Sequence, residues 1–206
     1  APDLHVASMD KFDIQLGNLH DRTVLIARTS YSGEDGFEIF AYAEDALIIW
    51  NNLTTQFNNK IGLVGFDALD VLRIEAGLLF FGKDMTGDET PSELGLDFFI
   101  ECTSDFRGKE QYYINKAHPR FKVMGVTSNS INCLGNFELF NRRNIKVGII
   151  RSYCFSPILN KNIGLAQVAT NEAYETNILL CRPKTTDNSK AFQVQLTNRR
   201  FLRNDL

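Results

Sequence analysis

The amino-acid sequence predicts an α+β protein whose second part is a small antiparallel β-barrel or sandwich. Helical periodicity is confined to residues 44–79, where apolar side chains recur at steps of three and four. The strands predicted beside these helices do not alternate with them regularly, which argues against a doubly wound sheet. Beyond residue 120 only short β-rich pieces remain, separated by Gly, Asn, Ser and Pro. We therefore expect two domains, residues 1–115 and 116–206, with a polar linker over 107–120.

The first domain is predicted to contain a β-hairpin followed by a helix. Residues 22–30 form a β-rich run, residues 32–36 break it, and residues 37–42 alternate well enough to be the returning strand. A helix is expected over residues 44–57. Its expected apolar stripe consists of Leu47, Trp50, Leu53 and Phe57.

A second helix is predicted over residues 66–79. Arg73 and Glu75 lie off its apolar stripe, so pairing of Asp70 with Arg73 would give a weak ion pair on the surface. The stripe itself consists of Phe66, Leu69, Leu72, Ala76 and Leu79. Further strands are expected at residues 96–101, 121–126, 147–150, 163–169 and 178–181.

Composition excludes several classes of function. The chain has 206 residues, 44% of them hydrophobic and 16 of them Phe, so we expect a substantial core rather than disorder. The net charge of -3 argues against nucleic-acid binding, which usually needs a basic surface. No apolar run approaches the roughly 18 residues of a membrane-spanning helix. The first residue is not Met, so the chain is either processed or part of a longer protein.

The four cysteines do not indicate a metal or redox site. They contain no CxxC pair, so neither a zinc site nor a redox motif is expected, and we predict no bound metal. Their apolar neighbours favour buried, reduced thiols. Such thiols suit a reducing compartment, the mitochondrial matrix or the cytoplasm. The cysteines are Cys102, Cys133, Cys154 and Cys181.

The loop and strand from Tyr31 to Glu38 are the first candidate for a binding site. Glycines at 33 and 36 permit a tight turn. Alternation places Phe37 and Glu38 on opposite faces of the strand, so one of them points inward. An inward carboxylate needs a donor, and an aminopyrimidine ring offers an N–H and an NH₂ side by side. The alternative is a solvated hairpin with acidic side chains.

Five further segments of the sequence form one pattern. They are Tyr31-Ser-Gly-Glu-Asp-Gly-Phe-Glu-Ile39, Leu72-Arg-Ile-Glu-Ala-Gly-Leu78, Phe81-Gly-Lys-Asp84, Thr90-Pro-Ser-Glu-Leu-Gly-Leu96 and Asp105-Phe-Arg-Gly-Lys109. In this order and spacing they resemble one known family, the folate-dependent aminomethyltransferases that include the T-protein of the glycine cleavage system. The Phe155–Ala166 stretch is also similar to the barrel signature of that family.

The resemblance implies a fold and a chemistry. Residues 1–115 would be the C-terminal half of a folate-binding domain, followed by the barrel. The cofactor would be tetrahydrofolate, and the donor an aminomethyl group on a lipoyl carrier protein similar to H-protein. Glu38 would hold the pterin ring, while Tyr31 and Phe37 would either flank the ligand or pack in the core.

Two departures from the family pattern keep other functions open. Leu69 stands where T-proteins usually have Arg, as in the folate portions of sarcosine and dimethylglycine dehydrogenases. The N-terminal segment that holds the family's catalytic Asp is expected to be absent, so no catalytic residue is assigned and a further subunit would have to supply that half. The alternatives are therefore a non-catalytic structural subunit of a larger assembly, or the folate domain of a methylamine-type demethylase or dehydrogenase.

Overall fold

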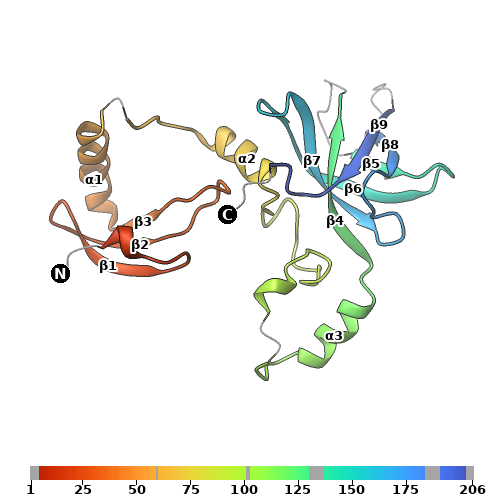
Figure 1. Ribbon diagram of the computed structural model, residues 1–206, viewed down its shortest axis with the longest axis horizontal. Helices are drawn as coiled ribbons and strands as arrows, with labels where there is room; N and C mark the ends of the chain where they lie inside the picture. Colours follow the sequence, from red (N-terminus) through yellow and green to blue (C-terminus); the bar gives the residue numbers. More distant parts are fainter. Residues whose placement is uncertain (1–4, 59, 101–102, 130–136, 184–190, 203–206) are drawn as a thin grey trace. The chain divides into compact units, whose positions relative to one another are not determined.

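A computed structural model describes residues 5–58, 60–100, 103–129, 137–183 and 191–202 (Figure 1). The chain divides into two compact units, Ala1–Leu69 (unit 1) and Asp70–Leu206 (unit 2). The domain boundary predicted between residues 115 and 116 remains a prediction.

Unit 1 is a three-stranded antiparallel sheet with one helix against it. A short 3-10 helix, η1 (Val6–Ser8), precedes the strands. His20 and Asp21 join the first two strands, and both have positive φ, as a type I′ hairpin turn requires. The sheet follows the order β1 (Ile14–Leu19), β2 (Arg22–Ala27) and β3 (Glu38–Ala41), and α1 (Ala43–Gln56) comes next.

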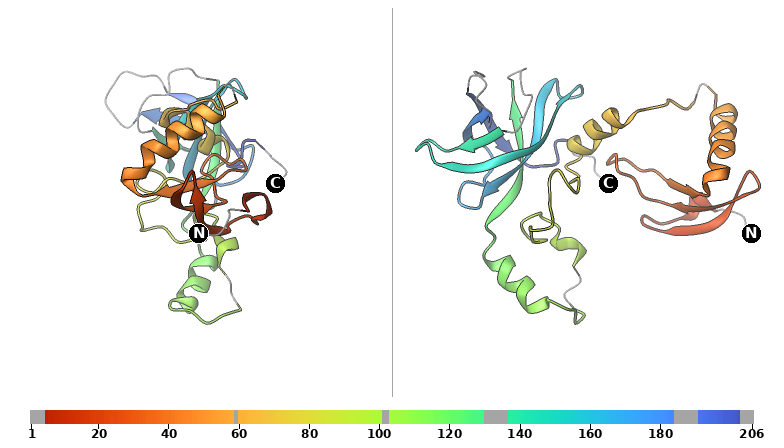
Figure 2. Two further views of the ribbon diagram at one scale, coloured as in Figure 1. Left: turned by 90° about the vertical axis from the view of Figure 1, so that its left-hand side faces the viewer. Right: turned by 180° about the vertical axis from the view of Figure 1, so that it is seen from behind.

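The core of unit 1 lies between α1 and one face of this sheet. Val24 and Ile26 of β2 pack with Ile49 of α1 and with Met9. In Figures 1 and 2, α1 stays on one side of the sheet from every direction shown. The stripe predicted for this helix is wrong in part, because Leu47 is 67% exposed while Ile49 is buried.

Unit 2 begins within α2 (Phe66–Glu75) and continues through a long loop segment. The strand predicted over residues 96–101 is wrong in its described part, which contains the 3-10 helix η2 (Asp97–Phe99). The segment predicted as a linker holds α3 (Lys109–Ala117). None of the described helices is long and apolar enough to cross a membrane.

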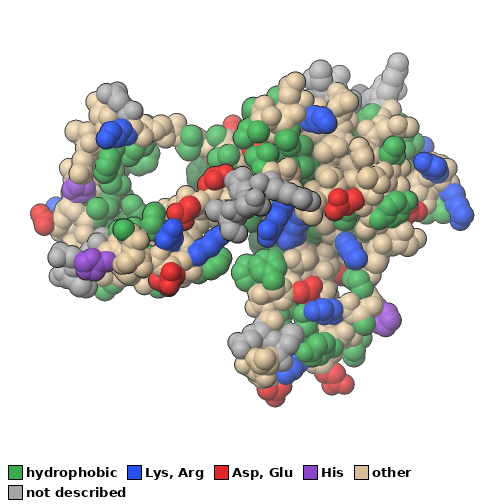
Figure 3. Space-filling model, viewed as in Figure 1, with side chains coloured by type: hydrophobic (Ala, Val, Ile, Leu, Met, Phe, Trp, Pro, Cys, Tyr) green, Lys and Arg blue, Asp and Glu red, His purple; other side chains and the backbone are tan. Residues whose placement is uncertain are grey.

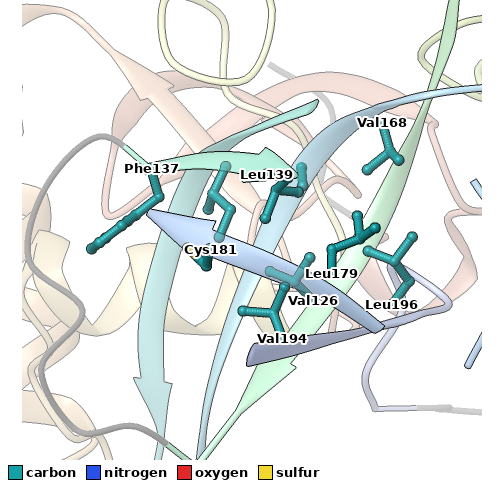
Figure 4. Close-up of a cluster of buried hydrophobic side chains, with 10 residues drawn as sticks. Val126, Phe137, Leu139, Val168, Leu179, Cys181, Val194 and Leu196 are labelled. Carbon is teal, nitrogen blue, oxygen red and sulfur yellow. The ribbon is translucent and has the colours of Figure 1, made fainter. Parts of the chain in front are cut away.

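The remainder of unit 2 is a closed antiparallel barrel, which confirms the predicted fold class. The strands run in the order β4-β7-β6-β5-β8-β9, and β9 pairs back onto β4 at Gly125 and Thr197. Alternate residues of each strand point inward, so the interior is filled by apolar side chains such as Leu139, Val168 and Leu196 (Figure 4). The strands are β4 (Phe121–Ser128), β5 (Phe137–Phe140), β6 (Lys146–Ser156), β7 (Lys161–Ala169), β8 (Ile178–Pro183) and β9 (Phe192–Thr197).

Candidate functional site

Glu38, the first residue of β3, lies on the face of the sheet opposite the core. It is paired with Ala27, which is paired in turn with Ile14. Directly opposed residues of antiparallel strands share a face, whereas successive residues alternate. Val24 and Ile26 face α1, so Glu38 shares the other face with Ile14, and its carboxylate is exposed.

The hydroxyl of Thr29 holds the Glu38 carboxylate. Thr29 Oγ1 donates a hydrogen bond to Oε2 of Glu38 across the two ends of the loop that joins β2 to β3. Each carboxylate oxygen can accept two hydrogen bonds, so this contact fixes the direction of the carboxylate and leaves Oε1 and the second lone pair of Oε2 able to accept from a ligand. The arrangement suits a planar ligand with two adjacent N–H donors.

Arg28 organises the loop that leads into β3. Its Nε and Nη2 donate to the two carboxylate oxygens of Asp35, at 3.1 and 3.0 Å. Its Nη1 donates to the carbonyl oxygen of Met9 at 2.5 Å. The hydrogen bond from Arg28 holds the pKa of Asp35 below its ordinary value. Because that carboxylate is engaged in closing the loop, Asp35 acts here as a turn residue.

The three residues predicted to bind a ligand are not gathered at one point. Phe37 is 43% exposed, and the Arg28 guanidinium lies 5.8 Å from the centroid of its ring. Tyr31 is partly buried within the loop, where Gly33 adopts a φ of 83°. Of the three, Glu38 alone is placed by the strand register on the sheet face that lies away from α1. The binding roles of all three remain predictions.

Sequence reasoning did not identify Thr29 or Arg28. Neither residue belongs to a recognisable pattern, because their partners are Glu38 and Asp35, nine and seven residues further along the chain. The register of β2 with β3 brings them together. These contacts could be predicted from the sequence only if the register of β2 with β3 were already known.

Unit 2 contains a second group of polar residues, and these are buried. Arg73 is 1% exposed; it donates to Asp70 Oδ1 at 2.8 Å and to Asp84 Oδ2 at 2.5 Å. Its Nη2 also donates to Ser152 Oγ of β6 at 2.8 Å. Glu75 accepts a hydrogen bond from Ser156 Oγ of the same strand. These contacts fasten the end of α2 to the barrel, and the predicted surface position of Arg73 is wrong.

Glu93 is a buried carboxylate whose ion-pair partner, Arg120, has an exposed side chain. It is 2% exposed and accepts hydrogen bonds from Nε and Nη2 of Arg120, at 2.7 and 2.9 Å. The hydrogen bond from Arg120 lowers the pKa of Glu93 to about 2. Arg120 precedes β4, so the pair joins the loop segment to the start of the barrel.

The titratable residues that the structure describes form no group suited to a metal ion. Cys154 is partly buried and Cys181 is buried, and burial raises the pKa of Cys154 to about 12. A thiol with so high a pKa is a poor nucleophile. Cys102 and Cys133 lie outside the described residues.

This chain is similar to one protein family and to several known proteins. The family described as GCVT N-terminal domain matches residues 1–104. An aminomethyltransferase of Thermotoga neapolitana is 34% identical over 168 residues, which are 81% of this chain and 46% of that protein. The heme-dependent oxidative N-demethylase gamma subunit of Ectopseudomonas mendocina is 35% identical over 162 residues, which are 73% of this chain and 43% of that protein.

The fold has a counterpart among solved structures. The glycine cleavage system aminomethyltransferase T from Bartonella henselae matches with a TM-score of 0.78 and 23% identity. The match covers 87% of this chain and 50% of that one. The chain therefore spans about half the length of the curated relatives it matches.

Proposed function

Because the chain belongs to the GCVT N-terminal domain family, we propose that it is part of a tetrahydrofolate-dependent aminomethyltransferase. The observation that carries this proposal is the exposed Glu38 carboxylate, which Thr29 orients on the sheet face that lies away from α1. A carboxylate held in this way can accept the adjacent N–H and NH₂ of the pterin's aminopyrimidine ring. Each such charge-assisted bond contributes about 1.5–3 kcal/mol.

The residues of this chain would bind and orient the ligand rather than perform the chemistry. Glu38 would fix the pterin edge, and Arg28 would keep the preceding loop in the shape that presents Tyr31 and Phe37. Bound tetrahydrofolate supplies the nitrogen that accepts the one-carbon unit. We assign no general acid or base to the chain.

The proposed donor is an aminomethyl group on a lipoyl carrier protein similar to H-protein, and ammonia is released as the methylene unit passes to the folate. This partner is carried over from the family resemblance. The relatives named above are bacterial, so they give no support to the predicted mitochondrial location.

Isothermal titration of tetrahydrofolate into the intact native protein tests the binding role. The variant Glu38→Gln exchanges one acceptor oxygen for a donor, so we expect its affinity to fall by about 10- to 100-fold. The matched control is Glu34→Gln, in the exposed part of the same loop, which should bind within about twofold of the unaltered protein. Absence of binding by the native protein would exclude the proposal and favour a structural subunit.

A second candidate function is the folate portion of an amine demethylase. Leu69 stands where T-proteins usually carry Arg, and the Ectopseudomonas mendocina relative is a subunit of an oxidative N-demethylase. The two functions differ in their donor. Formation of methylenetetrahydrofolate from an aminomethylated lipoyl protein supports the first, whereas formation only from a methylated amine with a redox partner supports the second.

A further inference from the structure

The sequence of β2 is that of a strand buried on both faces, yet the structure covers the second face only around Ala27, which is 6% exposed. The residues Thr23-Val-Leu-Ile-Ala27 form a continuous β-rich run, whereas a strand with one solvated face normally alternates with polar residues. Val24 and Ile26 are buried against α1. Leu25 and Ala27 point to the opposite face.

That opposite face continues as an apolar surface across the sheet. Leu25 is paired with Leu16 of β1 and with Phe40 of β3, so the three side chains lie in one row. Leu16 is 59% exposed and Phe40 is 54% exposed, and Ile14 beside them is 58% exposed. We call this surface the open face, defined by Ile14, Leu16, Leu25 and Phe40, with Glu38 at its end.

The open face is unlike the surface of a self-sufficient protein. Single exposed apolar residues are common, but a contiguous apolar row usually marks a contact with another element. Both β1 and β3 are edge strands of a sheet of three, so the backbone at the two margins is also available for pairing. Figure 3 shows hydrophobic side chains at the surface of unit 1 along α1 as well.

The lengths of the relatives indicate what covers this face. The chain matches 46% of the Thermotoga neapolitana aminomethyltransferase, and its fold matches 50% of the Bartonella henselae structure. The remainder of such a protein is large enough to supply a second layer of structure. Sheets with two apolar faces are completed by a layer on each face.

We infer that the open face is the docking surface for the complementary half of the GCVT fold, the polypeptide that corresponds to the part of the curated aminomethyltransferases outside this chain's match. Docking buries Leu16 and Phe40 and pairs an edge of the sheet. It also encloses Glu38, because that carboxylate lies on the same face. The contact itself does not depend on folate binding.

Binding between the 206-residue chain and this complementary half tests the inference. The probe is the part of the Thermotoga neapolitana aminomethyltransferase that lies outside the match, together with the corresponding part of at least two other relatives. Analytical ultracentrifugation should show a one-to-one complex. Amide hydrogen exchange should slow in β1 and β3 on binding.

Substitutions on the open face should weaken this complex without unfolding the chain. Leu16→Asp and Phe40→Asp each place a charge where the contact becomes dry, so we expect affinity to fall at least about 100-fold. Both side chains are exposed in the chain alone, so its circular dichroism and thermal unfolding should not change. The matched control is Ile158→Asp, at a residue 67% exposed in unit 2, which should bind as the unaltered chain does.

Three results would overturn the inference. The first is that no complementary half binds the chain. The second is that the Leu16→Asp and Ile158→Asp variants bind the complementary half equally well. The third is that the chain forms a homodimer which the Leu16→Asp substitution dissociates. Loss of folate binding with an intact complex would instead contradict only the proposed function.

Discussion

Nη1 of Arg73 lies 2.5 Å from Oδ2 of Asp84, and the side chains of both residues are 1% exposed. The same arginine also reaches Asp70 and, 79 residues further along the chain, Ser152 of the barrel. A buried charge is costly unless it is paired and hydrogen-bonded. The side chain of Arg73 therefore connects α2, the loop segment and the barrel through its hydrogen bonds to Asp70, Asp84 and Ser152.

Replacing Arg73 should destabilise unit 2 severely. Arg73→Met keeps much of the side-chain volume but leaves the buried Asp84 carboxylate without its cation. We expect a loss of about 3–5 kcal/mol in the free energy of unfolding, as for other broken buried ion pairs. Chemical denaturation monitored by circular dichroism measures it. Asp70→Asn is the control, because Asp70 is 36% exposed, and it should cost less than about 1 kcal/mol. Equal losses in the two variants would contradict the central role of Arg73.

Unit 2 should lose stability in acid through Glu93. Its pKa is lowered to about 2 from an ordinary value of 4.5 by the hydrogen bond from Arg120, so the unfolded chain binds the proton more readily than the folded one. The stabilisation is complete above pH 4.5 and is lost as the pH falls toward 2. Denaturation midpoints measured between pH 7 and pH 2 should decrease over that interval.

The variant Glu93→Gln tests this assignment. It removes the titrating group, so the decrease between pH 4.5 and pH 2 should become shallower, and stability at pH 7 should fall by about 1–3 kcal/mol. Glu89, whose pKa also lies at about 2, accounts for part of the remaining slope. Burial raises the pKa of Glu89, but hydrogen bonds from Thr86 and Gln167, among others, lower it by more than burial raises it. Glu110→Gln, on the exposed side of α3, is the control for the substitution itself and should leave the stability at pH 7 unchanged. An unchanged slope in Glu93→Gln would refute the assignment.

The fold was predictable where local patterns decide it. β2, β3, α1 and four of the barrel strands lie near the positions that β-rich runs and helical spacing predict, whereas the sequence patterns predict no strand at β1 or β9. β5 was not predicted, since its four residues are paired on both sides by β6 and β8, which are distant in sequence. The polar sequence of α3 predicts a linker, yet Tyr112 is buried there and donates a hydrogen bond to Asp97.

The candidate site was predictable only in part. Glu38 was selected from the motif, and the register of the sheet places it on an exposed face rather than in a closed cavity. The burial of Arg73 and Glu75 could not be read from the helix pattern, because their partners Ser152 and Ser156 lie about 80 residues away. Helical spacing reports which residues share a face, but not which face meets a polar partner.

Thr29 should control ligand affinity through Glu38. In Thr29→Val the hydroxyl that donates to the Glu38 carboxylate is lost, while the shape of the side chain is kept. Losing one orienting hydrogen bond should weaken tetrahydrofolate binding by the native protein about 2- to 10-fold, measured by isothermal titration. Thr29→Ser retains the hydroxyl and should bind normally. If Thr29→Ser and Thr29→Val bind alike, the hydroxyl has no positioning role.

Gly77 should be required for the junction between α2 and the barrel. The residue follows the end of α2 with a φ of 74°, and the amide of Leu78 donates to the carbonyl oxygen of Arg73, as in a Schellman cap. A β-carbon at this position would lie 2.5 Å from the carbonyl oxygen of Arg199, so Gly77→Ala adds a clash with the backbone to the strain of a left-handed conformation. We expect a loss of more than about 2 kcal/mol in unfolding free energy, since the conformational strain alone costs about 1–2 kcal/mol. Gly82→Ala separates the two causes: its φ is 91°, but no atom lies within 4 Å of the added β-carbon, so only the strain should be measured. A loss in Gly77→Ala no larger than in Gly82→Ala would show that the contact with Arg199 yields at little cost.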